Sequence, residues 1–416
     1  MNAYQREMRL MPYVLDMERR GVYIDERRLA YDLGVYKEHL TMLDDEICMQ
    51  LGQSVSINSK DALLKAMLRV GMVNEDKLHR TPTGKFSASK DSLFDAVEEP
   101  DLLGPLLVRG ALSTCINTFM EPWLESSREN DGKLYVKWNQ VRNYSGTGAL
   151  TGRLSSSPNL QNVPTIWERL LDKLTNIGYY IDFDMPSMRS YIIPKPGYVF
   201  ISRDYSAQEM RLLANFSNGA LLKAIQEDPS MDIHEIAAKL AGISRKQAKT
   251  LGFAIIYGAG VGLIAEMLRI SIAEATSLKK RYTQAMPEIA TLQKEQSNLV
   301  KVRMPIVTLA GREYHVEPPK MVQGRMRTFE YKLMNYRIQG SAADQTKEAM
   351  YQYCTNTEEG ELVLSVHDQL VAQVPRSSAA SEMKILEKAM NGSYQDVLLY
   401  QVMSDPAVGE TFGALK

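Results

Sequence analysis

The stretch "SVHDQLVAQV", residues 365–374, sets a histidine and an acid between runs of mostly aliphatic residues. This pattern predicts a strand, a tight turn and a second strand, with His367 and Asp368 at the tip of the turn. Charged groups at the tip of such a hairpin cost free energy unless an ion or a ligand uses them. The hairpin is therefore the first candidate for a functional site.

A second acid occupies a similar place. "PGYVFISRDYS", residues 196–206, predicts a turn and then an apolar strand that ends at Asp204. If the two strands are neighbours in one sheet, the carboxylates of Asp204 and Asp368 converge, and they repel each other unless they share a proton or a cation. Carboxylate oxygens suit Mg²⁺, which keeps some waters and is completed by substrate phosphates. The alternative is that each acid is an ordinary surface residue at a strand end, and the two acids alone do not decide.

A third pattern is a helical stripe in "SRKQAKTLGFAIIYGAG", residues 244–260. Arg245, Lys249, Phe253 and Tyr257 recur every four positions, and each step turns only about 40° around a helix. Such a stripe can bind a triphosphate at its basic end and stack on a sugar or a base at its aromatic end. The alternative is a solvated pair of cations followed by a buried aromatic pair.

Length and composition indicate an α+β protein of two or three lobes. A chain of 416 residues exceeds one ordinary core, and 44% hydrophobic with 24% charged residues is typical of soluble globular proteins. Helical patterns at 26–52, 60–70, 207–301 and 329–353 have strand patterns on both sides of the helical middle. The net charge of -1 predicts no overall attraction to nucleic acid, although a local basic groove can still bind it.

Location is predicted from the N-terminus and from cysteine use. No run of about 18 apolar residues is present, so we expect no membrane partner, and the charged N-terminus lacks a signal-peptide core. Cys48, Cys115 and Cys354 are scattered and form neither a disulfide framework nor a zinc-binding spacing. We therefore expect a cytoplasmic protein.

Three motifs together resemble the family A DNA polymerases, which are of the DNA polymerase I type. "DYSAQEMR" at 204–211, R-x3-K-x3-F-x3-YG at 245–258 and "VHDQ" at 366–369 occur in that family's order and spacing. "TGRLSSSPNLQNVP" at 151–164 and "MNYRIQGSAAD" at 334–344 resemble the segments that precede the first and last of these motifs. The resemblance covers essentially the whole chain and implies a right-hand fold with an antiparallel-sheet palm, a helical thumb and helical fingers.

The resemblance also implies domain boundaries. Residues 1–24 would lead into the palm, 25–125 would form the thumb, 126–210 the first part of the palm, 211–333 the fingers, and 334–416 the second part of the palm. The implied reaction is template-directed addition of dNTPs to a primer 3′-hydroxyl.

The resemblance assigns the metal ligands. Asp204 and Asp368 would hold two Mg²⁺ ions, with the Tyr205 carbonyl as a backbone ligand, and Mn²⁺ can substitute. One ion would activate the primer hydroxyl, and the other would hold the triphosphate and stabilise the leaving pyrophosphate. Positioning and charge neutralisation of this kind need carboxylates and cations rather than a covalent nucleophile.

The same resemblance assigns contacts to the nucleotide. Arg245, Lys249 and His234 match residues that touch the triphosphate. Phe253 matches the residue that faces the sugar, and Tyr257 matches the aromatic residue beside the templating position.

Sugar selection and DNA contacts follow in the same way. Glu209 matches a steric gate that leaves no space for a 2′-hydroxyl, which favours deoxynucleotides over ribonucleotides. Six further residues are implied contacts of the primer–template DNA: Arg153, Asn159, Gln161, Asn335, Gln339 and His367. Donors such as Arg and Gln in the minor groove can test base-pair geometry without reading sequence, because every correct pair presents acceptors there.

Several features depart from the family pattern, and three of them bear on the site or the fold. Gln369 stands where most members carry a second acid, and we expect activity to survive because both principal metal ligands remain. Tyr331 stands where an arginine is expected, so one template or primer contact is expected to be lost. Residues 165–184 are longer than the family's link at that point, and the sequence assigns them no role.

A fourth departure concerns proofreading. About 20 residues precede the polymerase-like region, which leaves no space for a 3′–5′ exonuclease domain, so we expect no proofreading in this chain. A separate exonuclease, helicase or clamp would then act as a partner. A compact polymerase of this kind fits a virus or a mobile element, in which case the location would be the host cytoplasm.

Two alternatives stay open at this stage. One is a related single-subunit RNA polymerase, against which Glu209 argues. The other is a catalytically silent primer–template binder or structural replisome subunit, which only Gln369 favours.

Overall fold

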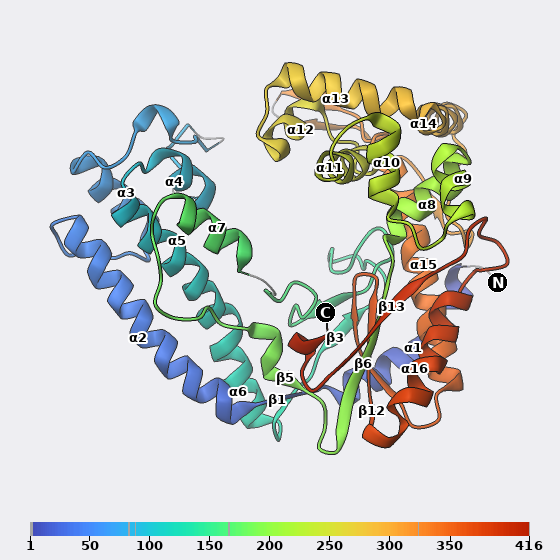
Figure 1. The fold of residues 1–416 in the computed structure, drawn as a ribbon, viewed down its shortest axis with the longest axis horizontal. Coiled ribbons are helices and arrows are strands. Elements are labelled where there is room, and N and C mark those ends of the chain that lie inside the picture. Colours follow the sequence, from blue (N-terminus) through green and yellow to red (C-terminus); the bar gives the residue numbers. More distant parts are fainter. Residues whose placement is uncertain (1–2, 82–83, 88, 165–166, 323, 416) are drawn as a thin grey trace.

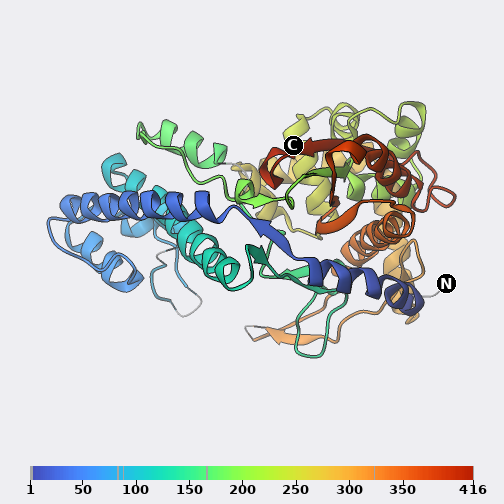
Figure 2. The same ribbon diagram turned by 90° about the horizontal axis from the view of Figure 1, so that it is seen from below.

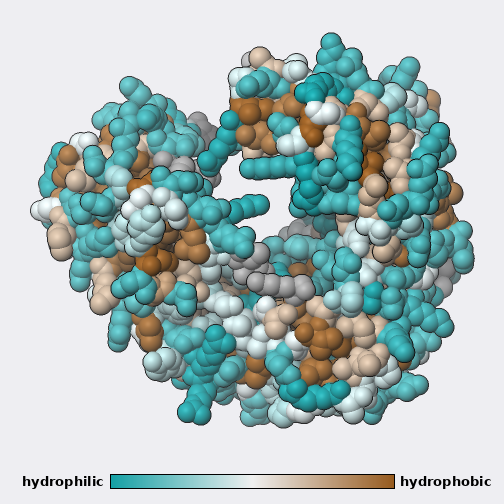
Figure 3. All heavy atoms as spheres, viewed as in Figure 1, coloured by the Kyte–Doolittle hydropathy of each residue, from teal (hydrophilic) through white to brown (hydrophobic). Residues whose placement is uncertain are grey.

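Three lobes surround an open cleft. The computed structural model describes residues 3–81, 84–87, 89–164, 167–322 and 324–415. A lobe built on a sheet, the palm, carries two helical lobes, the thumb and the fingers, which rise on opposite sides (Figure 1). The space-filling view shows the cleft between the helical lobes, with hydrophilic residues along much of its wall (Figure 3).

The palm is organised by a four-stranded antiparallel sheet of order β11-β12-β6-β13. Its strands are β6 (Tyr198–Tyr205), β11 (Glu361–Val366), β12 (Gln369–Pro375) and β13 (Ser404–Gly409). Phe200 and Ile201 of β6 are at most 1% exposed, and full burial of one such side chain stabilises the fold by about 1.5–3 kcal/mol. The predicted hairpin and the predicted neighbouring strand are both confirmed.

Helices cover this sheet. They are α1 (Ala3–Arg20), α15 (Lys332–Asn356) and α16 (Ala379–Gly392). Helix α16 packs on β6, β12 and β13, and α15 packs between α16 and α1 (Figure 2). A buried ion-pair cluster of Glu7, Arg312 and Lys347 ties α1 to α15 and to the turn at residues 308–312.

The thumb is a helical lobe that leaves and rejoins the palm at its base. Its helices are α2 (Glu26–Gln50), α3 (Lys60–Arg69), α4 (Lys90–Ala96), α5 (Pro100–Cys115) and α6 (Glu121–Glu129), with a 3-10 turn at Glu75–Lys77 and a π-helical turn at Ile116–Met120. The helices predicted at 26–52 and 60–70 are confirmed. The side chains of Asp25 and Ser59 cap α2 and α3, which explains where both begin.

One thumb segment is long and apolar. The helical run Pro100–Glu129 is, by length and composition, capable of crossing a membrane. However, 72% of its most apolar window is buried inside the protein, which is the pattern of a core helix. Within the thumb, α5 packs against α2.

The fingers contain seven helices in the described residues, where the sequence showed one continuous helical pattern. They are α8 (Gln208–Ser217), α9 (Ala220–Glu227), α10 (Ile233–Ala241), α11 (Arg245–Ile256), α12 (Val261–Leu268), α13 (Ile272–Ala285) and α14 (Pro287–Lys301). The helices α8, α10 and α12 end at residues with left-handed backbone, which are Asn218, Gly242 and Arg269. The helical pattern predicted for residues 207–301 is therefore confirmed, and these left-handed residues divide it into separate helices.

Short strands complete the fold. A three-stranded sheet at the base of the thumb joins β1 (Val22–Ile24), β2 (Lys133–Leu134) and β5 (Ile192–Ile193), and β3 (Lys137–Asn139) pairs with β4 (Ser155–Ser157). Two hairpins precede α15: β7 (Ile306–Val307) with β8 (Glu313–Tyr314), and β9 (Lys320–Val322) with β10 (Arg325–Arg327). The remaining elements are α7 (Glu168–Asn176) and 3-10 turns at Met188–Tyr191, Arg376–Ser378 and Phe412–Ala414.

Candidate active site

The two predicted acids converge at one end of the palm sheet. In the β6–β12 pair, Asp204 lies opposite Gln369, and the Tyr205 N–H donates to the Asp368 carbonyl oxygen over 3.3 Å. His367 adopts φ +57 at the tip of the β11–β12 turn, which lets the chain reverse and carry Asp368 beside Asp204. The two carboxylates, 164 residues apart in the sequence, are therefore neighbours.

The electrostatics of the pair are those of two desolvated acids side by side. Desolvation in the cleft raises the pKa of Asp204 to about 7, and the adjacent Asp368 carboxylate and a hydrogen bond to it add to the shift. Desolvation also raises the pKa of Asp368. Without a cation, the pair is most stable when it shares one proton, so a divalent ion would replace that proton. The donor set of two carboxylates with room for water fits a hard cation such as Mg²⁺ or Mn²⁺.

This pair predicts a pH-dependent effect of metal on stability. The folded pKa of Asp204, about 7, exceeds its ordinary value, so without metal its contribution to stability is largest in acid and is lost as the pH rises from about 4 to about 7. A cation binds the deprotonated pair, so we expect Mg²⁺ to raise the unfolding temperature more at pH 8 than at pH 5.5. Thermal unfolding with and without Mg²⁺ measures this. Equal shifts at both pH values, or an undiminished shift in Asp204→Asn, would contradict it.

A pocket of about 330 Å³ lies between the carboxylate end of the sheet and α11. Its described lining consists of Arg153, Ala207, Gln208, Glu209, Met210, Phe253, Tyr257, His367 and Asp368. The aromatic end of the predicted stripe and the predicted gate residue therefore face the same space as Asp368, one of the two acids predicted to hold metal. Arg245 and Lys249 lie nearer the start of α11, beyond this lining.

Glu209 is the centre of a hydrogen-bonded group in the pocket wall. Its side chain is only 8% exposed, and one carboxylate oxygen accepts from Arg153 and, over 3.3 Å, from the Gln339 amide. The same amide donates to the Tyr257 hydroxyl over 2.7 Å. The other oxygen, Oε2, is buried and has no hydrogen-bond partner among the described residues. Ala207, at φ +48, turns the chain into α8 and so aims Glu209 at the pocket.

Helix α11 carries the stripe as predicted. A capping box between Ser244 and Gln247 starts the helix at Arg245, and Tyr257 is the residue at its C-terminal cap. The Phe253 and Tyr257 rings stack with centroids 6.3 Å apart. The Arg245 guanidinium donates to the Asp232 carboxylate over 2.7 Å. A phosphate that binds Arg245 must therefore compete with this acid.

His234 lies behind the stripe. It is the second residue of α10, is 5% exposed, and its ring centroid is 5.9 Å from that of Phe253. Burial lowers the pKa of His234 to about 4, so its imidazole is neutral near pH 7 and offers a hydrogen bond without charge. Its Nδ1 is buried and has no partner among the described residues.

Two of the predicted DNA contacts, Asn159 and Gln161, have local roles in the structure, and a third, Asn335, has an acceptor that the described residues leave free. The Asn159 side chain accepts from the N–H groups of Gln161 and Asn162 over 3.1 and 3.2 Å, which stabilises a turn. The Gln161 amide donates to the Ser365 carbonyl over 2.9 Å and so holds this turn against the hairpin. Asn335, on α15, has a buried Oδ1 with no partner among the described residues, so this oxygen can still accept a hydrogen bond.

Two residues near the carboxylates were missed by the sequence analysis. Burial lowers the pKa of Arg189, and Asp204 lies close enough for its charge to oppose this shift in part. The Arg189 guanidinium lies 4.5 Å from the Phe412 ring centroid. Asp405 lies opposite Asp204 on β13 and accepts from the Ser206 hydroxyl over 2.9 Å. Neither residue belongs to a quoted motif, and only the sheet pairing and the 3-10 turn before β5 bring them here.

Gln369 does not replace the missing acid. Its amide donates to the Ser202 hydroxyl over 3.2 Å, so the side chain bonds along the sheet and adds no charge to the pair.

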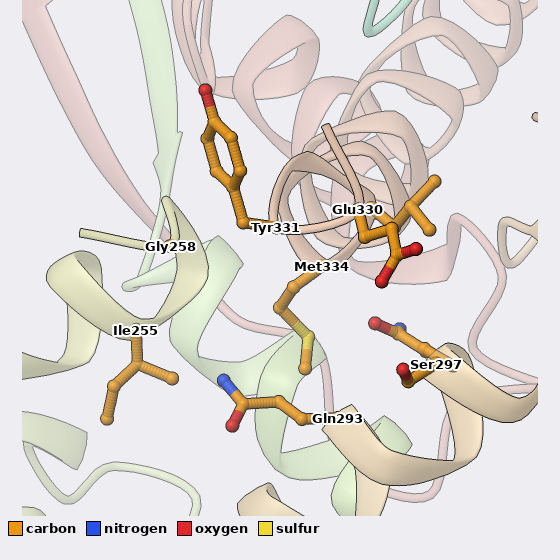
Figure 4. A pocket seen from close by; sticks show the side chains of 9 residues that line it. Ile255, Gly258, Gln293, Ser297, Glu330, Tyr331 and Met334 are labelled. Atoms are coloured by element: carbon orange, nitrogen blue, oxygen red, sulfur yellow. The ribbon is translucent and has the colours of Figure 1, made fainter. Parts of the chain in front are cut away.

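A second pocket, of about 210 Å³, lies where α11 meets α14 and α15 (Figure 4). Ile255, Gln293, Ser297 and Met334 line it from these helices. Gly258 stands at its edge with φ +68, and a Cβ there would lie 2.8 Å from the Tyr331 carbonyl oxygen, so only glycine fits. The Tyr331 that replaces an expected arginine thus packs at the joint between fingers and palm.

The chain is similar to known proteins over most of its length. The family model described as DNA polymerase family A matches residues 32–414. The thermostable DNA polymerase I of Thermus aquaticus is 29% identical over 404 residues, which cover 93% of this chain and 45% of the relative. DNA polymerase I of Chloroflexus aurantiacus is 27% identical over 414 residues, which cover 95% of this chain and 41% of the relative. The chain thus spans less than half the length of these curated relatives.

A solved structure shares the fold. The POL domain of Pol1 from M. smegmatis, in complex with DNA primer–template and dNTP, aligns with a TM-score of 0.81 and 23% identity over 98% of this chain and 70% of that one. The right-hand α+β fold is therefore confirmed, whereas a viral source stays a prediction. The chain belongs to DNA polymerase family A.

Proposed function

We propose that this chain is a template-directed DNA polymerase that adds dNTPs to a primer 3′-hydroxyl. The observation that carries the proposal is the pair of carboxylates, Asp204 and Asp368, at the edge of a pocket that is closed on its other side by the aromatic end of α11. Membership of DNA polymerase family A and the likeness to a POL domain with bound primer–template and dNTP support it.

We propose Mg²⁺ as the cofactor, two ions in number, with Mn²⁺ able to substitute. Asp204, Asp368 and the Tyr205 carbonyl would hold them. When bound, such ions make the primer hydroxyl a better nucleophile and neutralise charge on the triphosphate. The protein supplies the ligands, the raised pKa values of the pair and a partly enclosed site.

The chain's own residues would orient the nucleotide. Arg245 and Lys249 would bind the triphosphate, and Arg245 would exchange Asp232 for phosphate as it does so. The neutral His234 would donate a hydrogen bond rather than a charge. Phe253 would pack on the sugar, and Tyr257 would stack beside the templating base.

Contacts to DNA would come from both sides of the pocket. Arg153, Gln339 and Asn335 would reach the minor groove of the new pair, although Arg153 and Gln339 are bonded to Glu209 in the described state. Asn159, Gln161 and His367 would hold the backbone near the primer end. Binding of a correct pair would therefore rearrange the Glu209 group, a form of induced fit.

Other partners and the location are proposals of the same kind. We propose that these 416 residues carry no proofreading site, which the alignment of 98% of the chain with a POL domain supports. A separate exonuclease, helicase or clamp would then assist. The three free cysteines support a reducing location, the cytoplasm.

Primer extension on a recessed template tests the function. We expect wild-type protein to extend the primer with dNTPs under Mg²⁺ and under Mn²⁺, and a 5′-labelled primer with a 3′ mismatch not to shorten. Binding of the primer–template without extension under either metal would instead indicate a non-catalytic binding subunit. Shortening of the mismatched primer would contradict the absence of proofreading.

A further inference from the structure

Residues 167–186, which overlap the segment 165–184 to which the sequence assigns no role, form an excursion of the palm chain that returns to its starting point. The Trp167 indole N–H donates to the Pro186 carbonyl over 2.9 Å and closes its neck. Between these ends lie α7 and an irregular stretch. We name residues 167–186 the thumb strap.

The strap packs on thumb helix α5. Leu170 and Leu174 of α7 are at most 5% exposed, and α7 contacts α5. The Tyr179 ring lies directly on Gly104 of α5, where a Cβ would be only 2.2 Å from a ring carbon. With the Tyr179 ring in this place, only glycine fits at position 104.

The strap also binds thumb helix α2. The Tyr179 hydroxyl donates to the Glu46 carboxylate over 3.2 Å, and burial raises the pKa of both groups. The Phe183 ring stacks on His39 with centroids 3.9 Å apart and an interplanar angle of 17°. The Tyr36 hydroxyl donates to the Asp184 carbonyl over 3.0 Å. Polar and aromatic contacts thus alternate along one side of α2.

These contacts lie well beyond the base of the thumb. The chain enters and leaves the lobe at β1 and β2, which pair with each other. His39 is 13 residues after the start of α2 at Glu26, which is about 20 Å along a helix that rises 1.5 Å per residue. Figure 1 shows α7 beside α5, on the side of the thumb that faces the cleft. The strap therefore connects palm chain to the body of the thumb, in addition to the two connections at the base.

We propose that the thumb strap restrains the thumb from swinging away from the palm, and thereby holds duplex DNA in the cleft between successive nucleotide additions. This inference rests on the proposed polymerase function, because the duplex is its ligand. Release of the duplex past the thumb would require the strap contacts to break or slide. No strap residue lines the pocket at the carboxylates, so the insertion step itself should not depend on the strap.

The test compares Tyr179→Ala/Phe183→Ala with Tyr180→Ala. Tyr180 is a neighbouring strap tyrosine that is 74% exposed, so its loss controls for removal of an aromatic side chain. We expect the double variant to release primer–template about tenfold faster and to add correspondingly fewer nucleotides per binding event in the presence of a heparin trap. Its single-turnover rate of inserting one nucleotide should stay within about twofold of wild type, because the chemistry is untouched. Tyr180→Ala should resemble wild type in all three measurements.

A second variant controls for the possibility that the double substitution misfolds the strap itself. His39→Ala, on the thumb side, removes the stacking partner of Phe183 while leaving the strap sequence intact, and it should speed release in the same direction. Hydrogen exchange of α7 reports whether the strap has come free. Unchanged release and product length in a variant whose α7 exchanges freely would overturn the proposal. Failure of the wild type to insert any nucleotide would instead reject the proposed function, and the release measurement would still decide the role of the strap.

Discussion

Asp204→Asn is expected to reduce primer extension under Mg²⁺ by about 10³-fold or more. The substitution keeps the size of the side chain but removes one of the two charges that are proposed to hold a cation. Several kcal/mol of transition-state stabilisation correspond to about that factor. Asp368→Asn should have a similar effect, because the two carboxylates titrate and bind as a pair. Single-turnover insertion with saturating protein and dNTP measures the rate.

Asp405→Asn is the matched control for this loss. Asp405 lies opposite Asp204 in the β6–β13 pair, carries the same charge and bonds to Ser206. We expect Asp405→Asn to lower the insertion rate by no more than about tenfold. The Asp405 carboxylate would act on the site through its charge alone, because it is not one of the proposed metal ligands. Equal losses at Asp204 and Asp405, with intact folding, would mean that net negative charge and not ligation is what the site requires.

Glu209→Ala is expected to weaken discrimination against ribonucleotides by about 10²-fold. Removing the side chain opens the space that a 2′-hydroxyl would occupy and also releases Arg153 and Gln339 from the group they form with Glu209. The ratio of kcat/KM for a dNTP and its matching rNTP measures the effect. We expect the gain to come from faster rNTP insertion, with a smaller loss of dNTP insertion as the hydrogen-bonded group relaxes.

Glu209→Gln separates size from charge. Glutamine fills the same volume, so a steric gate should stay nearly closed to rNTPs, while the ion pair with Arg153 is lost. If Glu209→Gln admits ribonucleotides as readily as Glu209→Ala, exclusion depends on the carboxylate charge and not on its bulk. A wild type that already prefers rNTPs would revive the RNA polymerase alternative.

The candidate site shows which structural features local sequence patterns can predict. Period-four spacing predicted the α11 stripe correctly, because helix geometry places residues i and i+4 on one face whatever the rest of the chain does. The apolar runs ending at Asp204 and Asp368 predicted two strands for an equally local reason. The helical pattern across residues 207–301 did not give the ends of the separate helices: Arg269, for example, ends α12 with left-handed backbone and has no glycine beside it.

Contacts between residues far apart in the chain decided the remaining features of the site. The sequence by itself determined the helical stripe, the strand ends and, through the order of its motifs, the family. Only the tertiary structure decided that β6 pairs with β12 so that the acids meet, that Arg245 is held by Asp232, and that Glu209 shares its hydrogen bonds with Arg153 and Gln339. It also decided that residues 167–186 reach back to α2 and α5. The physical reason is that such contacts join residues far apart in the chain, and their energy depends on complementary partners that no local spacing encodes.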